Sequence, residues 1–260
     1  MFINNFDPVA IQIFSIEIRW YSLAYIFGIL IGWILAKRIF ISDSKLKEKF
    51  DDFVTYLIIG IIVGGRLGYV LFYNPYYYSN NFIDILKIWE GGMSFHGALI
   101  GVILATILFS KKYNFSALFL LDIIASVTPI GLFFGRIANF INSELYGKIT
   151  DVPWAVIFPL IDTSPRHPSQ IYESLLEGLL LFIILNIALL NKRNFTGLCS
   201  VLFLFFYGIF RIIAEQFRVP DAQLGYLISS ISMGTLLSII MILGSIIIFF
   251  KLIKNHDVAK

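Results

Sequence analysis

The amino-acid sequence predicts an all-α integral membrane protein with about seven transmembrane helices. Of its 260 residues, 58% are hydrophobic and only 14% are charged, and the mean hydropathy is +0.83. A soluble domain carries charge on about a quarter of its residues, so this composition is typical of a membrane protein. We therefore expect residues 1–260 to form a single polytopic membrane domain.

Seven apolar runs are long enough to cross a bilayer, which takes roughly 20 helical residues. We expect these spans at 19–40, 53–73, 93–110, 116–140, 170–190, 197–217 and 227–250. The third is short and is also compatible with a tilted or partly re-entrant segment. Residues 142–168 are rich in turn formers and too polar to cross, so they predict a small arm outside the membrane, between helices 4 and 5.

The basic residues predict the orientation of the spans. Most of them lie in alternate connections: Lys37, Arg38, Lys45, Lys47 and Lys49, then Lys111 and Lys112, then Lys192 and Arg193, then Lys251, Lys254 and Lys260. The positive-inside rule makes these connections cytoplasmic. The N-terminus is then outside, the C-terminus is cytoplasmic and the arm is extracytoplasmic. The N-terminus lacks the pattern of a cleaved signal peptide, and we expect none.

In this orientation the polar residues of the spans fall in the outer half of the bilayer. Ionisable groups inside a membrane are costly and usually serve a function, so their shared depth predicts one site. The residues concerned are Tyr21, Arg66, His96, Arg136, Asn139, Gln170, Tyr172, Glu173, Tyr207, Arg211 and Glu215.

Helical spacing supports this site. Tyr207, Arg211 and Glu215 follow one another at four-residue intervals, which places them on one helix face. An intramembrane charge costs about 2.5–3.5 kcal/mol on insertion scales. We expect Glu215 to offset part of this cost for Arg211, and Glu144 is a candidate partner for Arg136. The alternative is that such pairs only hold helices together.

Glycines and the single cysteine are expected to serve packing. Cys199 lies in an apolar helix, where a buried thiol is the expected role. Four glycine pairs have the spacing that lets membrane helices approach closely: Gly28/Gly32, Gly60/Gly64, Gly97/Gly101 and Gly131/Gly135.

Two histidines differ in context. His96 stands at a glycine-flanked helix start at the depth of the arginines, which favours a catalytic or substrate-contacting role. His167 lies where the arm meets the fifth span, and a structural role is favoured there. Because His and Cys are scattered, no metal site is expected. Because basic residues are not clustered on one face, no nucleic-acid partner is expected.

Several motifs together resemble bacterial prolipoprotein diacylglyceryl transferases over nearly the whole chain. They are 19–21 (RWY), 93–97 (MSFHG), 135–147 (GRIANFINSELYG), 166–173 (RHPSQIYE), 207–211 (YGIFR), Glu215 and 218–221 (RVPD). Ala98, Ala138 and Ser143 stand where glycine is usual in that family, which affects helix packing only. The arm is also short, which bears on substrate access.

This resemblance implies transfer of the diacylglyceryl group of phosphatidylglycerol to the lipobox cysteine of a prolipoprotein, whose signal peptide lies in the membrane. A thioether forms and glycerol phosphate is released, with no cofactor, in the bacterial cytoplasmic (inner) membrane. Catalytic roles are expected for His96, Arg136, Tyr207 and Arg211. Substrate contacts are expected for Tyr21, Arg66, Asn139, Asn142, Glu144, Gly147 and Glu215.

The expected roles follow the chemistry. Preorganised arginines suit the negative charge that develops on a phosphate leaving group, which is the role expected of Arg136 and Arg211. A thiol attacks as the thiolate, so a base is needed, and His96 is the titratable candidate. A thiolate stabilised by arginine is the alternative. Glu215 is expected to hold Arg211 or to contact the head group directly.

Two other functions are compatible with intramembrane Arg, Glu and His. A transporter or proton-coupled carrier uses such residues as relays. Against it, the polar residues stop in the outer half, and no inverted repeat is evident. A non-catalytic lipid-binding scaffold would need the arginines but not His96.

Overall fold

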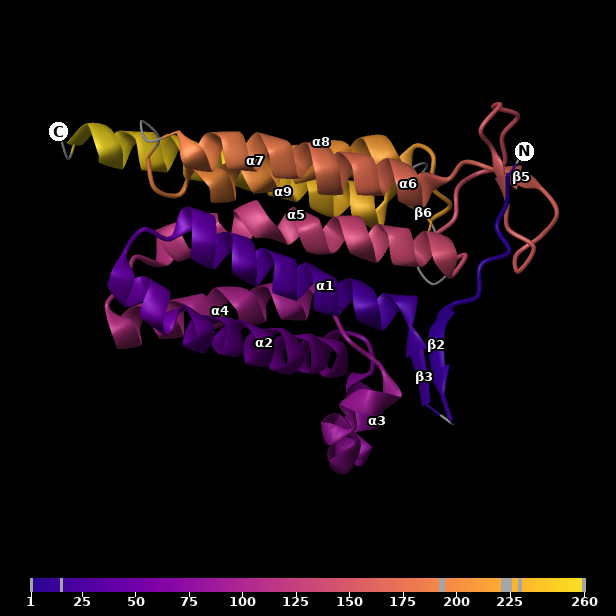
Figure 1. The fold of residues 1–260 in the computed structure, drawn as a ribbon, viewed down its shortest axis with the longest axis horizontal. Helices are drawn as coiled ribbons and strands as arrows, with labels where there is room; N and C mark the ends of the chain where they lie inside the picture. Colours follow the sequence, from indigo (N-terminus) through magenta and orange to yellow (C-terminus); the bar gives the residue numbers. More distant parts are fainter. Residues whose placement is uncertain (1, 15, 192–194, 221–225, 229–230, 259–260) are drawn as a thin grey trace. The chain divides into compact units, whose positions relative to one another are not determined.

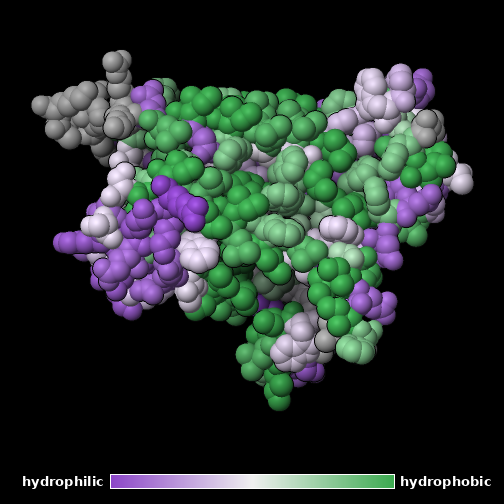
Figure 2. Space-filling model, in the orientation of Figure 1, coloured by the Kyte–Doolittle hydropathy of each residue, from purple (hydrophilic) through white to green (hydrophobic). Residues whose placement is uncertain are grey.

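The computed structural model describes residues 2–14, 16–191, 195–220, 226–228 and 231–258, which are mostly helical (Figure 1). Within these residues, six helices are long and apolar enough to cross a membrane: Trp20–Phe40, Ser44–Phe72, Ala117–Ile141, Ser169–Leu190, Leu198–Glu215 and Gly234–Lys254. The prediction of an all-α integral membrane protein is therefore confirmed. Large apolar side chains cover much of the surface in Figure 2, as lipid-facing helices require.

The third expected span coincides with helix α4 (Phe95–Tyr113), which is not among these six helices. Its crossing of the membrane stays a prediction, as does the orientation of the chain. The chain forms two compact units. The first unit is Met1–Ala36 with Asp122–Lys260, and the second unit is Lys37–Leu121.

The second unit is a pair of closely packed helices with a short helical connection. Helix α2 (Ser44–Phe72) begins at Asp43, whose carboxylate accepts hydrogen bonds from the backbone N–H groups of Lys45 and Leu46. A Cβ added at Gly64 would lie 2.9 Å from the Cα of Gly101 in α4, so the predicted close packing of these glycines is confirmed. The connection contains α3 (Pro75–Asn80), η2 (Phe82–Leu86) and η3 (Ile88–Glu90).

The first unit holds the remaining long helices. Helix α1 (Trp20–Leu35), which continues as the π-helical η1 (Ala36–Phe40), packs against α5 (Ala117–Ile141). A Cβ at Gly28 would lie 2.8 Å from the Cα of Gly131, which confirms the close approach of this pair. The segments α6 (Ser169–Glu173), π-helical η4 (Ser174–Leu180) and α7 (Leu181–Leu190) form one continuous helical span. Two separate helices follow it, α8 (Leu198–Glu215) and α9 (Met233–Val258).

The N-terminal end of α8 is held by a buried carboxylate. Asp122 of α5 accepts hydrogen bonds from the backbone N–H groups of Gly197 at 2.6 Å and Ser200 at 2.8 Å. These groups lie at the start of α8, where N–H groups lack helical partners. Nearby Cys199 is buried, as expected.

Short strands lie at one end of the helices of the first unit (Figure 1). Strand β2 (Val9–Ile13) pairs antiparallel with β3 (Ile16–Arg19). In the arm, β4 (Val156–Ile157) lies between β1 (Phe2–Ile3), to which it is parallel, and β5 (Pro165–Arg166), to which it is antiparallel.

The seventh span begins later than expected. The apolar run starts at residue 227, but β6 (Tyr226–Ile228) pairs with β7 (Ile231–Ser232), and α9 starts only at Met233. Ser232 explains this start, because its hydroxyl accepts a hydrogen bond from the N–H of Thr235 at 3.1 Å and so caps the first turn.

Candidate active site

A fully buried carboxylate gathers three arginines in the first unit. Glu173, at the end of α6, has a side chain with no exposed surface. Its Oε2 lies 2.9 Å from Nε of Arg136 in α5. Its Oε1 lies 3.1 Å from Nη1 of Arg211 in α8 and 3.2 Å from Nη1 of Arg218, which follows α8. Two helices and a loop are thus tied to one side chain.

A second buried carboxylate lies one turn further along the same helical span. Glu177 in η4 accepts a hydrogen bond from Nη2 of Arg136 at 3.0 Å, and its other oxygen lies 3.6 Å from Nη1 of Arg211. Sequence analysis missed this residue. The signal was present, because Glu177 follows Glu173 by four residues and therefore shares its helix face.

The expected pairing of Arg211 with Glu215 is confirmed. Nη2 of Arg211 donates to Oε1 of Glu215 in a short ion pair, and Oε2 of Glu215 accepts a hydrogen bond from the Ser232 hydroxyl at 2.8 Å. Tyr207 lies one turn before Arg211, with its ring stacked on Phe203 at a centroid distance of 5.6 Å. Tyr207 is also close enough to Arg136 and Glu177 for their charges to act on it.

The charges in this group balance. We call the group formed by these three arginines and three glutamates the arginine–glutamate cluster: Arg136, Arg211, Arg218, Glu173, Glu177 and Glu215. Buried charges are tolerated when each has an opposite partner. Nη1 of Arg136 has no partner among the described residues, and 14% of this side chain is exposed. Nη1 therefore has donor capacity that the described residues do not use.

Glu144 is not the partner of Arg136, contrary to the candidate pairing. Its carboxylate instead accepts hydrogen bonds from Nδ2 of Asn139 at 3.0 Å and from Nδ2 of Asn142 at 3.3 Å. Left-handed backbone at Ser143 and Leu145 turns the chain sharply after α5, which brings Glu144 back over the helix end. Arg136 instead pairs with Glu173 and Glu177 of the facing helix through Nε and Nη2.

Tyr21 lies at the same end of the first unit. It is close enough to Glu144 and Arg136 for their charges to act on it, and its hydroxyl lies 3.2 Å from that of Tyr25. Oδ1 of Asn142 is buried without a hydrogen-bond partner among the described residues. This acceptor could take a hydroxyl of a bound head group.

Gly147 joins the arm to the end of α8. It forms a β-bridge with Arg218, and its carbonyl accepts a hydrogen bond from Nη1 of Arg166 at 3.1 Å. A Cβ at this position would lie 2.7 Å from the Cβ of His167, so only glycine fits the close approach. The backbone of Gly147 thus lies directly beside that of Arg218.

Charged and aromatic side chains make contacts that stabilise the arm. The Arg166 guanidinium forms a short ion pair with Asp162 and holds the pKa of that carboxyl below its usual value. Burial lowers the pKa of His167, whose Nδ1 lies 3.2 Å from the Tyr172 hydroxyl. These contacts agree with the structural role favoured for His167.

The second unit carries the other two expected site residues. Arg66 is buried, and its guanidinium donates to the carbonyls of Asp84 at 2.5 Å, Ile85 at 2.9 Å and Gly91 at 2.5 Å. It therefore holds the connection that leads into α4. His96 lies in the first turn of α4, and its side chain is outside the described part of the structure.

Comparison with known proteins identifies the family. A family model described as "Prolipoprotein diacylglyceryl transferase" matches residues 8–251. The chain belongs to this family. Three similar proteins are each named "Phosphatidylglycerol--prolipoprotein diacylglyceryl transferase". The Rickettsia typhi protein is 52% identical over 253 residues, covering 95% of this chain and 98% of its own. The Rickettsia canadensis protein is 52% identical, covering 98% and 100%, and the Rickettsia rickettsii protein is 53% identical, covering 94% and 96%.

Within this member of the prolipoprotein diacylglyceryl transferase family, the first unit brings most of the expected site residues together. Arg136, Tyr207, Arg211 and Glu215 meet in or beside the arginine–glutamate cluster. Tyr21, Asn139, Asn142 and Glu144 gather at the adjoining end of α5. In the part of the chain that is described, no group of three or more His, Cys, Asp or Glu side chains is placed to hold a metal ion.

Proposed function

We propose that this protein transfers the diacylglyceryl group of phosphatidylglycerol to the lipobox cysteine of a prolipoprotein, in the bacterial cytoplasmic membrane and at a site in its outer half. The observation that carries the proposal is the buried arginine–glutamate cluster, in which three guanidinium groups are held in fixed positions. Family membership and the names of the relatives support the same reaction.

The transfer is a substitution at carbon. The cysteine sulfur attacks the glycerol carbon that carries the phosphate ester, a C–S bond forms and the C–O bond breaks. The bonding electrons pass to the phosphate oxygen, which leaves as glycerol phosphate. Fixed donors in a low-dielectric site stabilise such developing charge far better than water-exposed ones. We assign this role to Arg136, through its open Nη1 edge, and to Arg211.

The thiol proton must leave before or during the attack. His96 is the proposed acceptor, since imidazole titrates near neutral pH. A thiolate stabilised by the arginines is the alternative. Tyr21, Tyr207, Asn139 and Asn142 are proposed to orient head-group oxygens, together with Glu144, which the two asparagines contact.

Arg66 and Gly147 are proposed to act through their neighbours. Among the described residues, the hydrogen bonds of the Arg66 guanidinium go to backbone carbonyls of the connection before α4, so it positions the start of the helix that carries His96. Gly147 positions Arg218 through their β-bridge.

A transfer assay tests the proposal. Purified protein is mixed with phosphatidylglycerol and a lipobox peptide, and the peptide mass is measured. We expect a rise equal to one diacylglyceryl group, and no rise for the same peptide with serine in place of cysteine. An unchanged mass with protein that circular dichroism shows to be folded would refute the function.

A topology assay tests the depth of the site. A reporter fused after Lys111 is expected to be cytoplasmic, and one inserted near Thr150 is expected to be extracytoplasmic. The reverse pattern would place the arginine–glutamate cluster in the inner half of the bilayer.

A further inference from the structure

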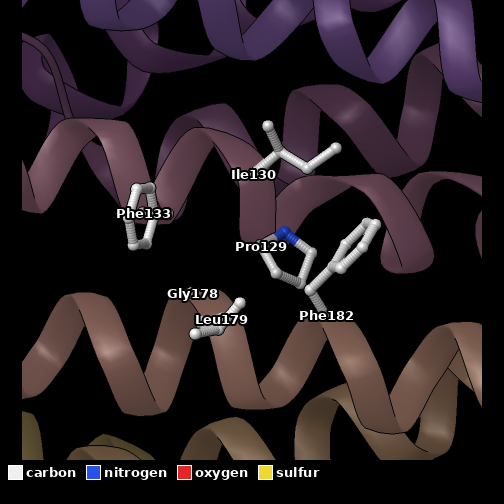
Figure 3. A pocket seen from close by; sticks show the side chains of 6 residues that line it. All are labelled: Pro129, Ile130, Phe133, Gly178, Leu179 and Phe182. Carbon is white, nitrogen blue, oxygen red and sulfur yellow. The ribbon is translucent and has the colours of Figure 1, made fainter.

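An apolar cavity of about 150 Å³ lies between α5 and the η4–α7 helix, inside the first unit (Figure 3). Its lining has no polar side chain and consists of Pro129, Ile130, Phe133, Gly178, Leu179 and Phe182. The cavity is open to the surface of this unit, and its lining offers a ligand only apolar contacts. Its ligand chemistry is therefore hydrocarbon.

Gly178 of η4 and Pro129 of α5 affect how closely these two helical segments approach each other around the cavity. A Cβ added at Gly178 would lie 2.6 Å from the Cβ of Phe133, so the two helices touch there. Pro129 lies inside α5, where a proline has no N–H to donate to the preceding turn of the helix. The glycine and the proline thus lie on opposite walls of the cavity.

The cavity and the arginine–glutamate cluster are lined by the same two helical segments, α5 and α6–η4–α7. Pro129, Phe133 and Arg136 are spaced i, i+4 and i+7, so they share one face of α5. Seven residues correspond to about 10 Å along a helix, or two turns. On the opposite wall, Gly178 directly follows Glu177. An amphiphile with an anionic head at Arg136 would therefore place apolar atoms beside the cavity.

We propose that this cavity binds a segment of one acyl chain of the donor phospholipid while its phosphate lies at Arg136 and Arg211. The inference rests on the proposed function. In the orientation proposed above, the cavity is deeper in the bilayer than the cluster, which is the direction that an acyl chain takes from its head group. Leu179 is 47% exposed, so this wall faces the lipid and the chain enters sideways.

Photolabelling tests the site without relying on activity. The probe is phosphatidylglycerol with a diazirine in one acyl chain, added to the full-length protein in neutral detergent, and the labelled residues are mapped by mass spectrometry. We expect label at Ile130, Phe133 or Phe182, competed by excess unlabelled phosphatidylglycerol but not by phosphatidylcholine. Equal competition by both lipids would mean that any bilayer lipid fills the cavity, and would overturn the proposal.

A pair of matched substitutions tests whether the acyl chain binds in the cavity itself. Leu179→Trp fills the cavity from its wall, whereas Ile183→Trp adds the same ring to an exposed position of α7 outside the lining. We expect Leu179→Trp to lower kcat/KM for a long-chain donor on the order of tenfold and to remove the label, and Ile183→Trp to do neither. A Leu179→Trp protein that keeps its label and kinetics would overturn the proposal.

The two proposals fail differently. Absence of transfer by the folded wild-type protein with any donor would refute the proposed function. Normal transfer with no label in the cavity would refute only the acyl-chain site. The wild-type labelling arm decides this even where a tryptophan variant does not fold.

Discussion

Glu173→Gln is the most informative single substitution, because one fully buried carboxylate is within ion-pair distance of three arginines. Glutamine keeps the shape of the side chain, removes its negative charge and turns one acceptor oxygen into an N–H₂ donor. That donor would face a guanidinium group, which has only donors of its own. The arginine–glutamate cluster would then hold three positive charges against two negative ones.

The expected loss of stability is large. Breaking a buried ion pair by removing one partner costs about 3–5 kcal/mol, because the other charge stays buried. Arg136 and Arg211 retain Glu177, and Arg211 also retains Glu215, so the loss should stay within this range although three contacts change. A displacement of about 1 Å in the arginines can lower activity about a hundredfold.

Unfolding of the purified protein in a mild detergent, by heat or denaturant, measures the loss, and the transfer assay measures kcat and KM separately. The control is Glu17→Gln, which removes a pair with Arg19 whose side chains are 46% and 62% exposed. That change should cost less than about 1 kcal/mol. If Glu173→Gln were no less stable than Glu17→Gln, the central role of Glu173 would be wrong.

Three further predictions concern the site and the arm. Arg136→Ala and Arg211→Ala should abolish transfer, with only partial rescue by lysine, which cannot form the same paired hydrogen bonds; undiminished turnover would remove these residues from the phosphate role. His96→Ala should lose activity across pH 6–8 in the same assay, and normal rates there would exclude it as the base. The folded arm lowers the pKa of Asp162 through Arg166 and that of His167 through burial. Stability from both groups is present at neutral pH and is lost as the pH falls, through histidine protonation below about 6.5 and then through the carboxyl below about 4. The protection factors of amide hydrogens in the arm, which compare exchange with its intrinsic rate at each pH, should therefore fall at acid pH, and constant protection factors from pH 7 to pH 3 would contradict this.

The positions of the helices could be predicted from the sequence wherever hydrophobicity alone determines them. Apolar runs located most helices to within a few residues, and glycine spacing marked residues that lie at the α2–α4 and α1–α5 contacts. Helix α2 begins at Ser44, nine residues before its apolar run, because Asp43 caps a charged first segment, and α9 ends at Val258, beyond its apolar run. The start of α9 also differed. An apolar run does not distinguish a strand from a helix, and the deciding feature was the hydroxyl of Ser232, which caps the helix.

The site was predictable in its arginines but not in their partners. Arg136 and Arg211 are conspicuous because charge is costly in an apolar run. Their partner Glu177 was missed, and Glu144 was paired wrongly with Arg136. Pairing depends on how helices far apart in sequence face each other, which spacing along one helix does not reveal.

The balance of charge in the arginine–glutamate cluster has a consequence for turnover. Phosphatidylglycerol carries one negative charge on its phosphate, whereas glycerol phosphate carries nearly two at neutral pH. Three arginines without carboxylates would attract the second anion more strongly than the first, and the enzyme would be inhibited by its own product. Three carboxylates already paired to them weaken the net attraction for the doubly charged product, while the fixed donors still act on the charge that develops during the reaction. We therefore expect the glutamates to favour product release as well as folding.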